Sequence, residues 1–316
     1  MQEDPAELPV TDIRHRTRGR SSRISAQVQG RVLWFESDDV ELSPNPEVFA
    51  SALLIPALNA GLTLKFDQPL SSTWVTNCRQ LLRIYNEWWG YPENLPIAPH
   101  ADHPRESVSL KTALCFTGGA DSFYSLLRSG NEIDYLVNIQ GFIDTPLADV
   151  RRLVALEKSI REVARQTSTI PVFVRTNFLE LSLIATTDWE RAHGGGLMAV
   201  GHAMADVAAR HLVSSSWGFD SVKPWGTHWM TDHLWSSASM QIIHVGAELQ
   251  RALKLREIAA EPLVHDHLHV CWENLSSEVN CSRCDKCLRT RITLLDCGQL
   301  NNFRCLAGAE TLAGDL

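Results

Sequence analysis

Residues 112–123 read Thr-Ala-Leu-Cys-Phe-Thr-Gly-Gly-Ala-Asp-Ser-Phe, and this stretch decides the fold. Its apolar start is typical of a buried strand, while Asp121 and Ser122 suit the first turn of a helix. Between them lie Gly118 and Gly119, which let backbone N–H groups approach an anion without a Cβ in the way. The helix N-terminus adds partial positive charge. We expect the anion to be bound by Thr117, Gly118, Gly119, Ala120, Asp121 and Ser122.

The elements after this loop alternate between strand and helix. Strand patterns occupy 112–116, 135–139 and 171–175, and helical patterns start at Asp121 and run over about 147–165. Such alternation is typical of βαβ units with right-handed crossovers. The predicted fold class is therefore α/β, a Rossmann-like parallel sheet with helices on both faces.

The first hundred residues are expected to form smaller, separate units. Two short strand patterns are followed by helical patterns from Pro46 to Leu58 and from Ser71 or Ser72 to Trp89. Prolines then favour an extended linker. The predicted divisions are a polar lead-in at 1–24, a small α+β domain at 25–91, a linker at 92–109, a main domain at 110–300 and a tail at 301–316.

Four of the eight cysteines fall within 17 residues, at Cys271, Cys281, Cys284 and Cys287. Clustering of this kind indicates a metal site rather than disulfides. Four thiolates around one Zn²⁺ make a closed, structural site, so a C-terminal zinc-bound segment is predicted. The alternatives are an iron–sulfur cluster, four unligated core cysteines, and a site in which His267 or His269 replaces Cys271.

The loop and the cysteine cluster together resemble the ATP pyrophosphatase superfamily. The segment from Thr117 to Ser122 is similar to its Ser-Gly-Gly-x-Asp-Ser loop, with Thr117 keeping the hydroxyl of the usual serine. A cysteine followed by Cys-x-x-Cys-x-x-Cys is similar to the 7-cyano-7-deazaguanine synthase family. The resemblance implies a HUP-type fold. It also implies that the loop holds the phosphates of ATP, that Mg²⁺ neutralises them, and that a substrate oxygen attacks the α-phosphate with release of pyrophosphate.

This likeness covers about 112–295, is specific only at its two ends, and leaves the first 110 residues unmatched. We therefore expect a relative with a different, purine-like substrate. The favoured chemistry is adenylation followed by sulfur transfer to a guanine-type base, as in purine thiolation enzymes that make 6-thioguanine. Nitrogen insertion to give an amide or nitrile is the alternative, and a non-catalytic nucleotide-binding partner protein is another.

Cys115 and Asp121 are the candidate catalytic residues. Cys115 lies two residues before Thr117, at the end of the strand that leads into the loop. A persulfide on its sulfur would attack an adenylated carbonyl carbon and displace AMP. The alternative is an inert thiol in the core.

Aromatic and charged residues gather between 193 and 235 and suit a flat heterocycle. A tryptophan would stack on the base, and an aspartate would accept hydrogen bonds from exocyclic amines. The candidate substrate-binding residues are Trp217, His228, Asp232 and Trp235.

Composition limits the partners. The net charge of −8 argues against general nucleic-acid binding, and no apolar stretch of membrane-spanning length occurs. The chain is expected in the cytoplasm, with ATP, Mg²⁺ and Zn²⁺ as cofactors. Besides the substrate, a sulfur or ammonia donor protein and a homodimer are the partners considered.

Overall fold

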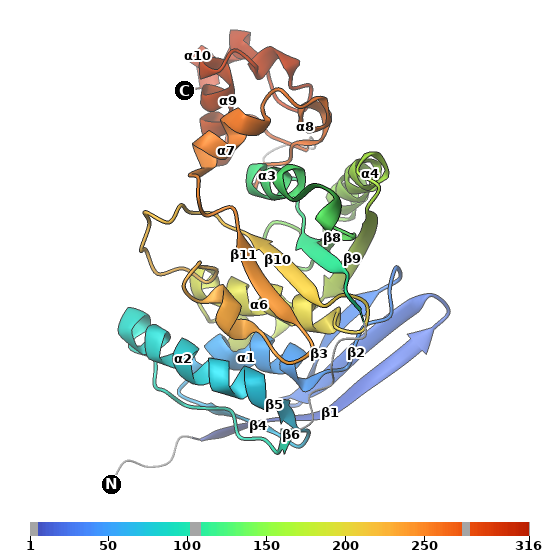
Figure 1. Cartoon of the computed structure of the whole chain (residues 1–316), viewed down its shortest axis with the longest axis vertical. Coiled ribbons are helices and arrows are strands. Elements are labelled where there is room, and N and C mark those ends of the chain that lie inside the picture. The colour runs from blue at the N-terminus through green and yellow to red at the C-terminus, as the bar shows by residue number, and fades with distance from the viewer. Residues whose placement is uncertain (1–5, 102–108, 274–278, 316) are drawn as a thin grey trace.

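A nine-stranded sheet runs through the described part of the chain, residues 6–101, 109–273 and 279–315 of a computed structural model (Figure 1). Its spatial order is β11-β10-β7-β8-β9-β3-β2-β1-β4, and five of its eight neighbouring pairs are parallel. Helices cover both faces, as Figure 1 shows. The α/β prediction, with a mostly parallel sheet flanked by helices, is confirmed.

Five parallel strands form one half of the sheet. They are β7 (Thr112–Cys115), β8 (Tyr135–Gln140), β9 (Ile170–Thr176), β10 (Arg210–Ser214) and β11 (Gln241–Val245). Counted along the chain, their spatial order is 3-2-1-4-5, so the direction of winding reverses between β7 and β10. In open α/β sheets of this kind, ligands bind outside the carboxyl ends of the strands at that reversal. The glycine loop follows β7 and therefore lies at this point.

The N-terminal region adds four strands to the same sheet. They are β1 (Glu7–Arg18), β2 (Ser21–Val28), β3 (Arg31–Ser37) and β4 (Thr63–Phe66). β3 pairs antiparallel with β9 through Phe35 and Glu36, which joins the two halves of the sheet.

Two predictions of chain organisation are therefore wrong. The expected lead-in at 1–24 contains β1, because its alternating buried side chains Leu8 and Val10 pack into the core. The expected domain at 25–91 is not separate, since one apolar core runs from these strands into the parallel half.

The predicted linker at 92–109 and the predicted tail at 301–316 both contain regular structure. Within 92–109, Ile97 exchanges backbone hydrogen bonds with β4, and β6 (His100–Ala101) pairs with β5 (Leu70–Ser71); residues 102–108 lie outside the described part. In the tail, α10 (Ala309–Asp315) is held by Arg291, which donates to the carbonyls of Ala307 and Gly308.

One face of the sheet carries α1 (Pro46–Asn59), α2 (Ser72–Trp89) and α6 (Trp189–Ala203). The first two match the predicted helices closely. α1 packs against α6 and against the strands β1 and β4, and its residues 47–58 are all buried, which explains why its sequence is largely apolar around the helix.

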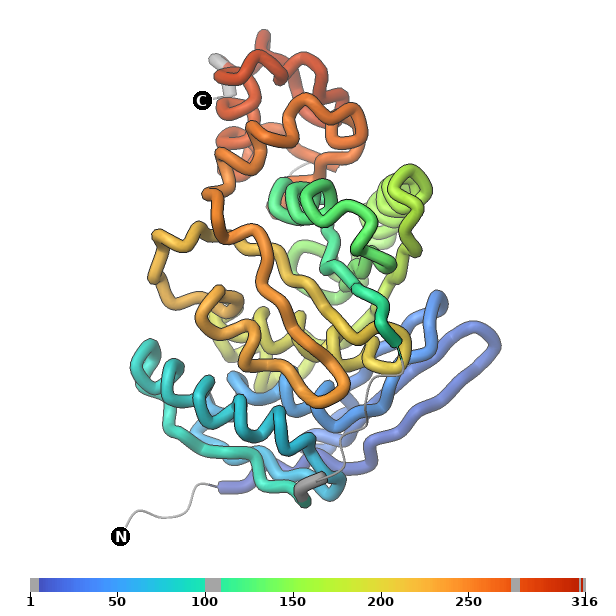
Figure 2. The backbone as a smooth tube through the Cα atoms, viewed as in Figure 1, coloured from blue at the N-terminus to red at the C-terminus, as the bar shows by residue number. Residues whose placement is uncertain are grey.

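The opposite face carries the helices that surround the glycine loop. They are α3 (Ala120–Ser129), α4 (Val150–Gln166), α7 (Arg251–Ile258), α8 (Pro262–His267) and α9 (Asp285–Asp296). The backbone trace in Figure 2 shows the C-terminal segment sitting above α3, at the end of the molecule away from β1. Short helices connect these elements: α5 (Ser182–Ala185), η1 (Gly130–Glu132), η2 (Phe178–Glu180), η3 (Asp232–Trp235) and η4 (Leu300–Asn302). In the described part, no helix is long and apolar enough to cross a membrane.

Three consecutive glycines in α6 permit the close packing of α6 on its neighbours. A Cβ at Gly195 would overlap the backbone carbonyl oxygen of Ser51 in α1. Gly194, Gly195 and Gly196 are all buried within the helix.

We expect Gly195→Ala to destabilise the protein by about 1–2 kcal/mol, because backbone overlap (about 1–3 kcal/mol) outweighs the gain in helix propensity of about 1 kcal/mol. Urea unfolding measures the difference. The matched control is Gly314→Ala in α10, where a Cβ meets nothing within 4 Å, and this change should not destabilise. Equal stabilities of Gly195→Ala and the wild type would contradict the α1–α6 packing.

Candidate functional site

The glycine loop connects β7 to α3 with the geometry of an anion cradle. Gly118 has φ +75°, a conformation that glycine adopts without strain, and Gly119 is the N-cap of α3. The Ser122 hydroxyl donates to the Gly119 carbonyl at 3.0 Å and closes the turn. Successive N–H groups in such a turn, together with a helix N-terminus, form a concavity that attracts anions.

Two cations flank the loop and hold Asp121. Arg251 Nη1 donates to Asp121 Oδ2 at 2.8 Å, and Lys254 Nζ donates to Asp121 Oδ1 at 3.3 Å and to the Ser215 carbonyl at 2.5 Å. Lys254 is fully buried, and this burial lowers the pKa of its ammonium group, opposed by the charge of Asp121. Asp121 is therefore bonded to two cations, and the charge of Glu248 also acts on Lys254.

The segment leading to the cysteine cluster packs directly on the loop. A Cβ at Gly118 would lie 3.3 Å from the His267 carbonyl oxygen. His269 N–H donates to the Gly118 carbonyl at 2.7 Å, and the His269 ring contacts both Thr117 and Arg152. Burial lowers the pKa of His269 to about 4, with the charge of Arg152 acting in the same direction, so the ring is neutral at pH 7.

A cavity of about 270 Å³ opens beside the loop. At the loop end, it is lined by Thr117, Gly119, Asp121, Ser122, Arg251 and Lys286. Away from the loop its lining is aromatic and apolar, with Phe142, Trp189, His193, Leu197, Val213 and Trp225. The Trp189 and Trp225 rings lie 5.7 Å and 5.6 Å from that of His193. The cavity thus combines a positive, hydrogen-bonding end with a wall suited to a flat ring.

Cys115 lines this cavity, with its sulfur 3.1 Å from Nε2 of His211 on the neighbouring strand β10. Burial raises the pKa of the Cys115 thiol to about 12 and lowers the pKa of His211 to about 3. Both groups are therefore neutral at pH 7. The pair has the geometry for proton transfer from sulfur to nitrogen, but it does not hold a thiolate at rest.

The predicted substrate-binding residues lie outside the cavity lining. Asp232 is fully buried, where it accepts from the His228 backbone N–H at 2.8 Å and from His244 Nδ1 at 2.7 Å. Trp235 is fully buried beside Tyr85. The His228 ring packs on Trp88.

Trp217 is 39% exposed and reaches the cavity only through Trp225, with which it makes an edge-on contact. Residue type alone could not separate these side chains from the ones that line the cavity, because burial in the core suits the same aromatic residues.

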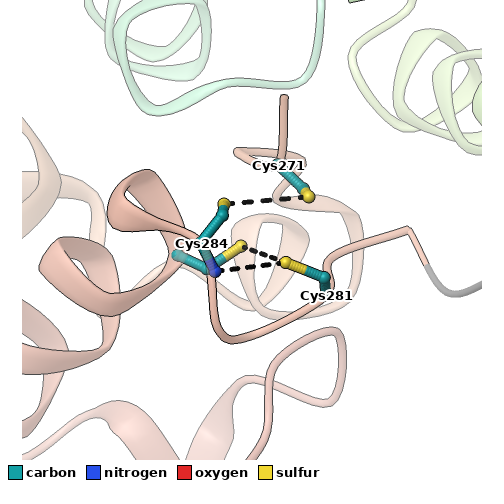
Figure 3. Close-up of side chains that lie close together, drawn as sticks. Cys271, Cys281 and Cys284 are labelled. Atoms are coloured by element: carbon teal, nitrogen blue, oxygen red, sulfur yellow. Dashed lines mark hydrogen bonds between the residues drawn. The ribbon is translucent and has the colours of Figure 1, made fainter. Parts of the chain in front are cut away.

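The four predicted metal ligands come together. Cys271, Cys281, Cys284 and Cys287 place their sulfurs within 4.8 Å of one another. Figure 3 shows Cys271 and Cys281 approaching Cys284 from two segments. The sulfurs of Cys284 and Cys271 are 3.9 Å apart, and those of Cys281 and Cys287 are 4.0 Å apart. A tetrahedron with Zn–S bonds of about 2.3 Å requires S···S separations of about 3.8 Å, so the cluster fits zinc.

Neither His267 nor His269 takes the place of the fourth ligand in the structure. His269 bonds to Arg152 and to the loop, and Nδ1 of His267 lies 2.8 Å from the Ser159 hydroxyl. Cys271 completes the cluster instead.

Several site residues were missed in the sequence. Arg251 and Lys254 occur three residues apart in a helix that follows a strand of the sheet, a pattern that points to one helix face. No local sequence pattern marks Arg152, His211 and His269 as site residues, because each bonds to a partner about 95 to 155 residues away in the chain.

Comparisons with models of known families, with curated proteins and with solved structures gave no match to this chain. The function is therefore argued from the site itself.

We expect the purified protein to contain about one zinc per chain by elemental analysis. Cys284→Ser should lose most of the zinc, and its free energy of unfolding should be lower by more than about 2 kcal/mol, because bound metal stabilises the folded state by mass action. Cys297→Ser is the matched control, since the Cys297 thiol donates to the Leu294 carbonyl, lies outside the four-cysteine cluster and should leave the metal in place. Iron in place of zinc would contradict the assignment.

Proposed function

We propose that the protein is an ATP pyrophosphatase-type enzyme with a HUP-type fold. It adenylates a carbonyl oxygen of a small, purine-like substrate and then replaces that oxygen, with sulfur as the favoured incoming atom. The observation that carries the proposal is the composition of one cavity. It brings together an anion-binding glycine loop, an aromatic wall and the Cys115 thiol.

The loop end of the cavity supports binding of ATP phosphates. The N–H groups around Gly118 and Gly119, the Ser122 hydroxyl, Arg251 and Lys286 supply donors and positive charge in one place. Asp121 acts here by orienting Arg251 and Lys254, to which it is bonded. The 3-2-1-4-5 strand order also supports the HUP-type assignment.

The first step joins the substrate oxygen to the α-phosphorus of ATP. The phosphoanhydride bond between the α- and β-phosphates breaks, pyrophosphate leaves, and the ring N–H proton of the base passes to water. Mg²⁺, carried by the phosphates, would neutralise the leaving charge, and Asp144 lines the cavity with a carboxylate of the type that Mg²⁺ binds, whereas the oxygens of Asp121 are bonded to Arg251 and Lys254. Arg251 and Lys286 would hold the departing pyrophosphate.

The second step uses the sulfur at Cys115. A donor protein loads a persulfide, whose outer sulfur bonds to the adenylated carbon while the C–O bond to AMP breaks. The proton on the outer sulfur passes to His211 Nε2, which is neutral and therefore able to accept it. A dithiol reductant then cleaves the S–S bond, leaving the thiocarbonyl on the base and restoring the Cys115 thiol.

Two alternatives remain as proposals. Ammonia from a donor protein would attack the same carbon, displace AMP and need no cysteine. A non-catalytic nucleotide-binding protein would bind ATP at the loop and turn nothing over. The zinc cluster has a structural role in each case, because four protein ligands leave no open position on the metal.

Screening purines for ATP-dependent pyrophosphate release tests the proposed function. We expect release with at least one guanine-type base and, with a persulfide donor and a dithiol present, formation of its thio derivative. Binding of ATP without turnover of any purine would favour the binding protein instead.

Within the enzyme class, Cys115→Ala should retain ATP binding and pyrophosphate release but lower thio-product formation by at least about 10³-fold, because the sulfur carrier is missing. Mass spectrometry of the product provides the measurement. Cys78→Ala is the matched control, since Cys78 is buried in the core away from the cavity. Full thio-product formation by Cys115→Ala would exclude this role of the cysteine.

A further inference from the structure

Two successive carbonyls of the glycine loop are both bonded to one residue, His269. The His269 main-chain N–H donates to the Gly118 carbonyl at 2.7 Å. Its ring Nδ1 lies 3.3 Å from the Thr117 carbonyl oxygen. The backbone of the same segment, at His267 and His269, also packs directly against Gly118.

The tautomer of the His269 ring follows from its other partner. Arg152 Nη2 lies 2.9 Å from His269 Nε2, and a guanidinium group has donors only. Nε2 must therefore be the acceptor, which places the ring proton on Nδ1. Nδ1–H is then the donor to the Thr117 carbonyl. Arg152 is itself held by the Cys271 carbonyl at 2.7 Å.

The direction of the loop's N–H groups follows from these bonds. In a trans peptide the N–H points opposite to the C=O. With the Thr117 and Gly118 carbonyls turned to His269, the N–H groups of Gly118 and Gly119 point away from it. Gly119 N–H makes only a long contact of 3.4 Å, to the Thr117 hydroxyl. The positive φ of Gly118 is the conformation that allows two successive N–H groups to share one side.

We propose that His269 is a positioning residue of the phosphate site: it holds two loop carbonyls and so presents the Gly118 and Gly119 N–H groups to the phosphates, while Arg152 fixes its tautomer. This rests on the proposed function. The segment 267–271 thereby acquires a second role, besides supplying Cys271 to the cysteine cluster. The cysteine cluster anchors Cys271, and His269, two residues earlier, transmits that anchoring to the loop.

Three variants separate positioning from general stability. In His269→Asn the side-chain amide occupies nearly the place of Nδ1–H and still donates to Thr117. In His269→Gln the amide lies about where Nε2 was, so it still meets Arg152 but not Thr117. His269→Ala removes both contacts. His267→Ala is the matched control, since its ring bonds to Ser159 and not to the loop.

Binding of inorganic pyrophosphate and of ATP, measured by titration calorimetry, is the first readout. We expect dissociation constants about tenfold higher for His269→Ala and His269→Gln, about the effect of one lost hydrogen bond, and near wild-type for His269→Asn and His267→Ala. Zinc content should be equal in all. If His269→Ala fails to fold, the Asn and Gln variants carry the comparison. Binding by His269→Gln as tight as that of the wild type would overturn the proposal.

Ring ¹⁵N chemical shifts are the second readout, with the His269 signals identified by their loss in His269→Asn. We expect the proton on Nδ1, and a proton on Nε2 alone would overturn the assignment. A wild-type protein that binds neither probe would instead refute the proposed function itself. Binding that is normal in the wild type and unchanged in His269→Ala would refute only the role of His269.

Discussion

The contact between the segment 267–271 and the glycine loop is the constraint on which the site depends. The two stretches lie about 150 residues apart in sequence and meet with the His267 carbonyl, the His269 main chain and the His269 ring against Thr117 and Gly118. Gly118 has no side chain, and this absence makes the approach feasible. The same segment ends at Cys271, a member of the four-cysteine cluster.

Charged side chains contact one another on the other side of the loop. Asp121 could be read as a catalytic carboxylate, but its oxygens are occupied by Arg251 and Lys254. Burying Lys254 costs free energy that only a bonded carboxylate and carbonyl offset. The arrangement keeps two cations next to a loop whose N–H groups already favour anions. Cys115 lines the same cavity and contacts His211, and both groups are neutral because burial disfavours a charged pair.

Several predictions that rest on local sequence patterns are confirmed by the structure. The period of apolar residues predicted α1 and α2, the strand–glycine–helix pattern predicted β7 and α3, and the two-residue gaps between cysteines predicted the cluster of four thiols. The predicted substrate-binding residues Asp232 and Trp235 do not line the cavity, because residues as polar or aromatic as those of a cavity can also pack inside the core. The two short strand patterns correspond to β2 and β3, but β1 was not predicted, because its buried alternation is limited to Leu8 and Val10. The pairing of β3 with β9 is invisible in either strand alone.

The sequence by itself determined the α/β class, the loop that follows the first parallel strand, and four cysteines spaced for one metal. These depend on residues close together in the chain, whose spacing translates directly into backbone geometry. Only the tertiary structure decided that the N-terminal strands extend the same sheet, and that Trp189 and Trp225 line the cavity in place of Trp235. The tertiary structure alone shows that Cys115 contacts His211 and that Thr117 contacts His269. Such contacts join distant segments, and they arise from how whole elements pack, which no local spacing records.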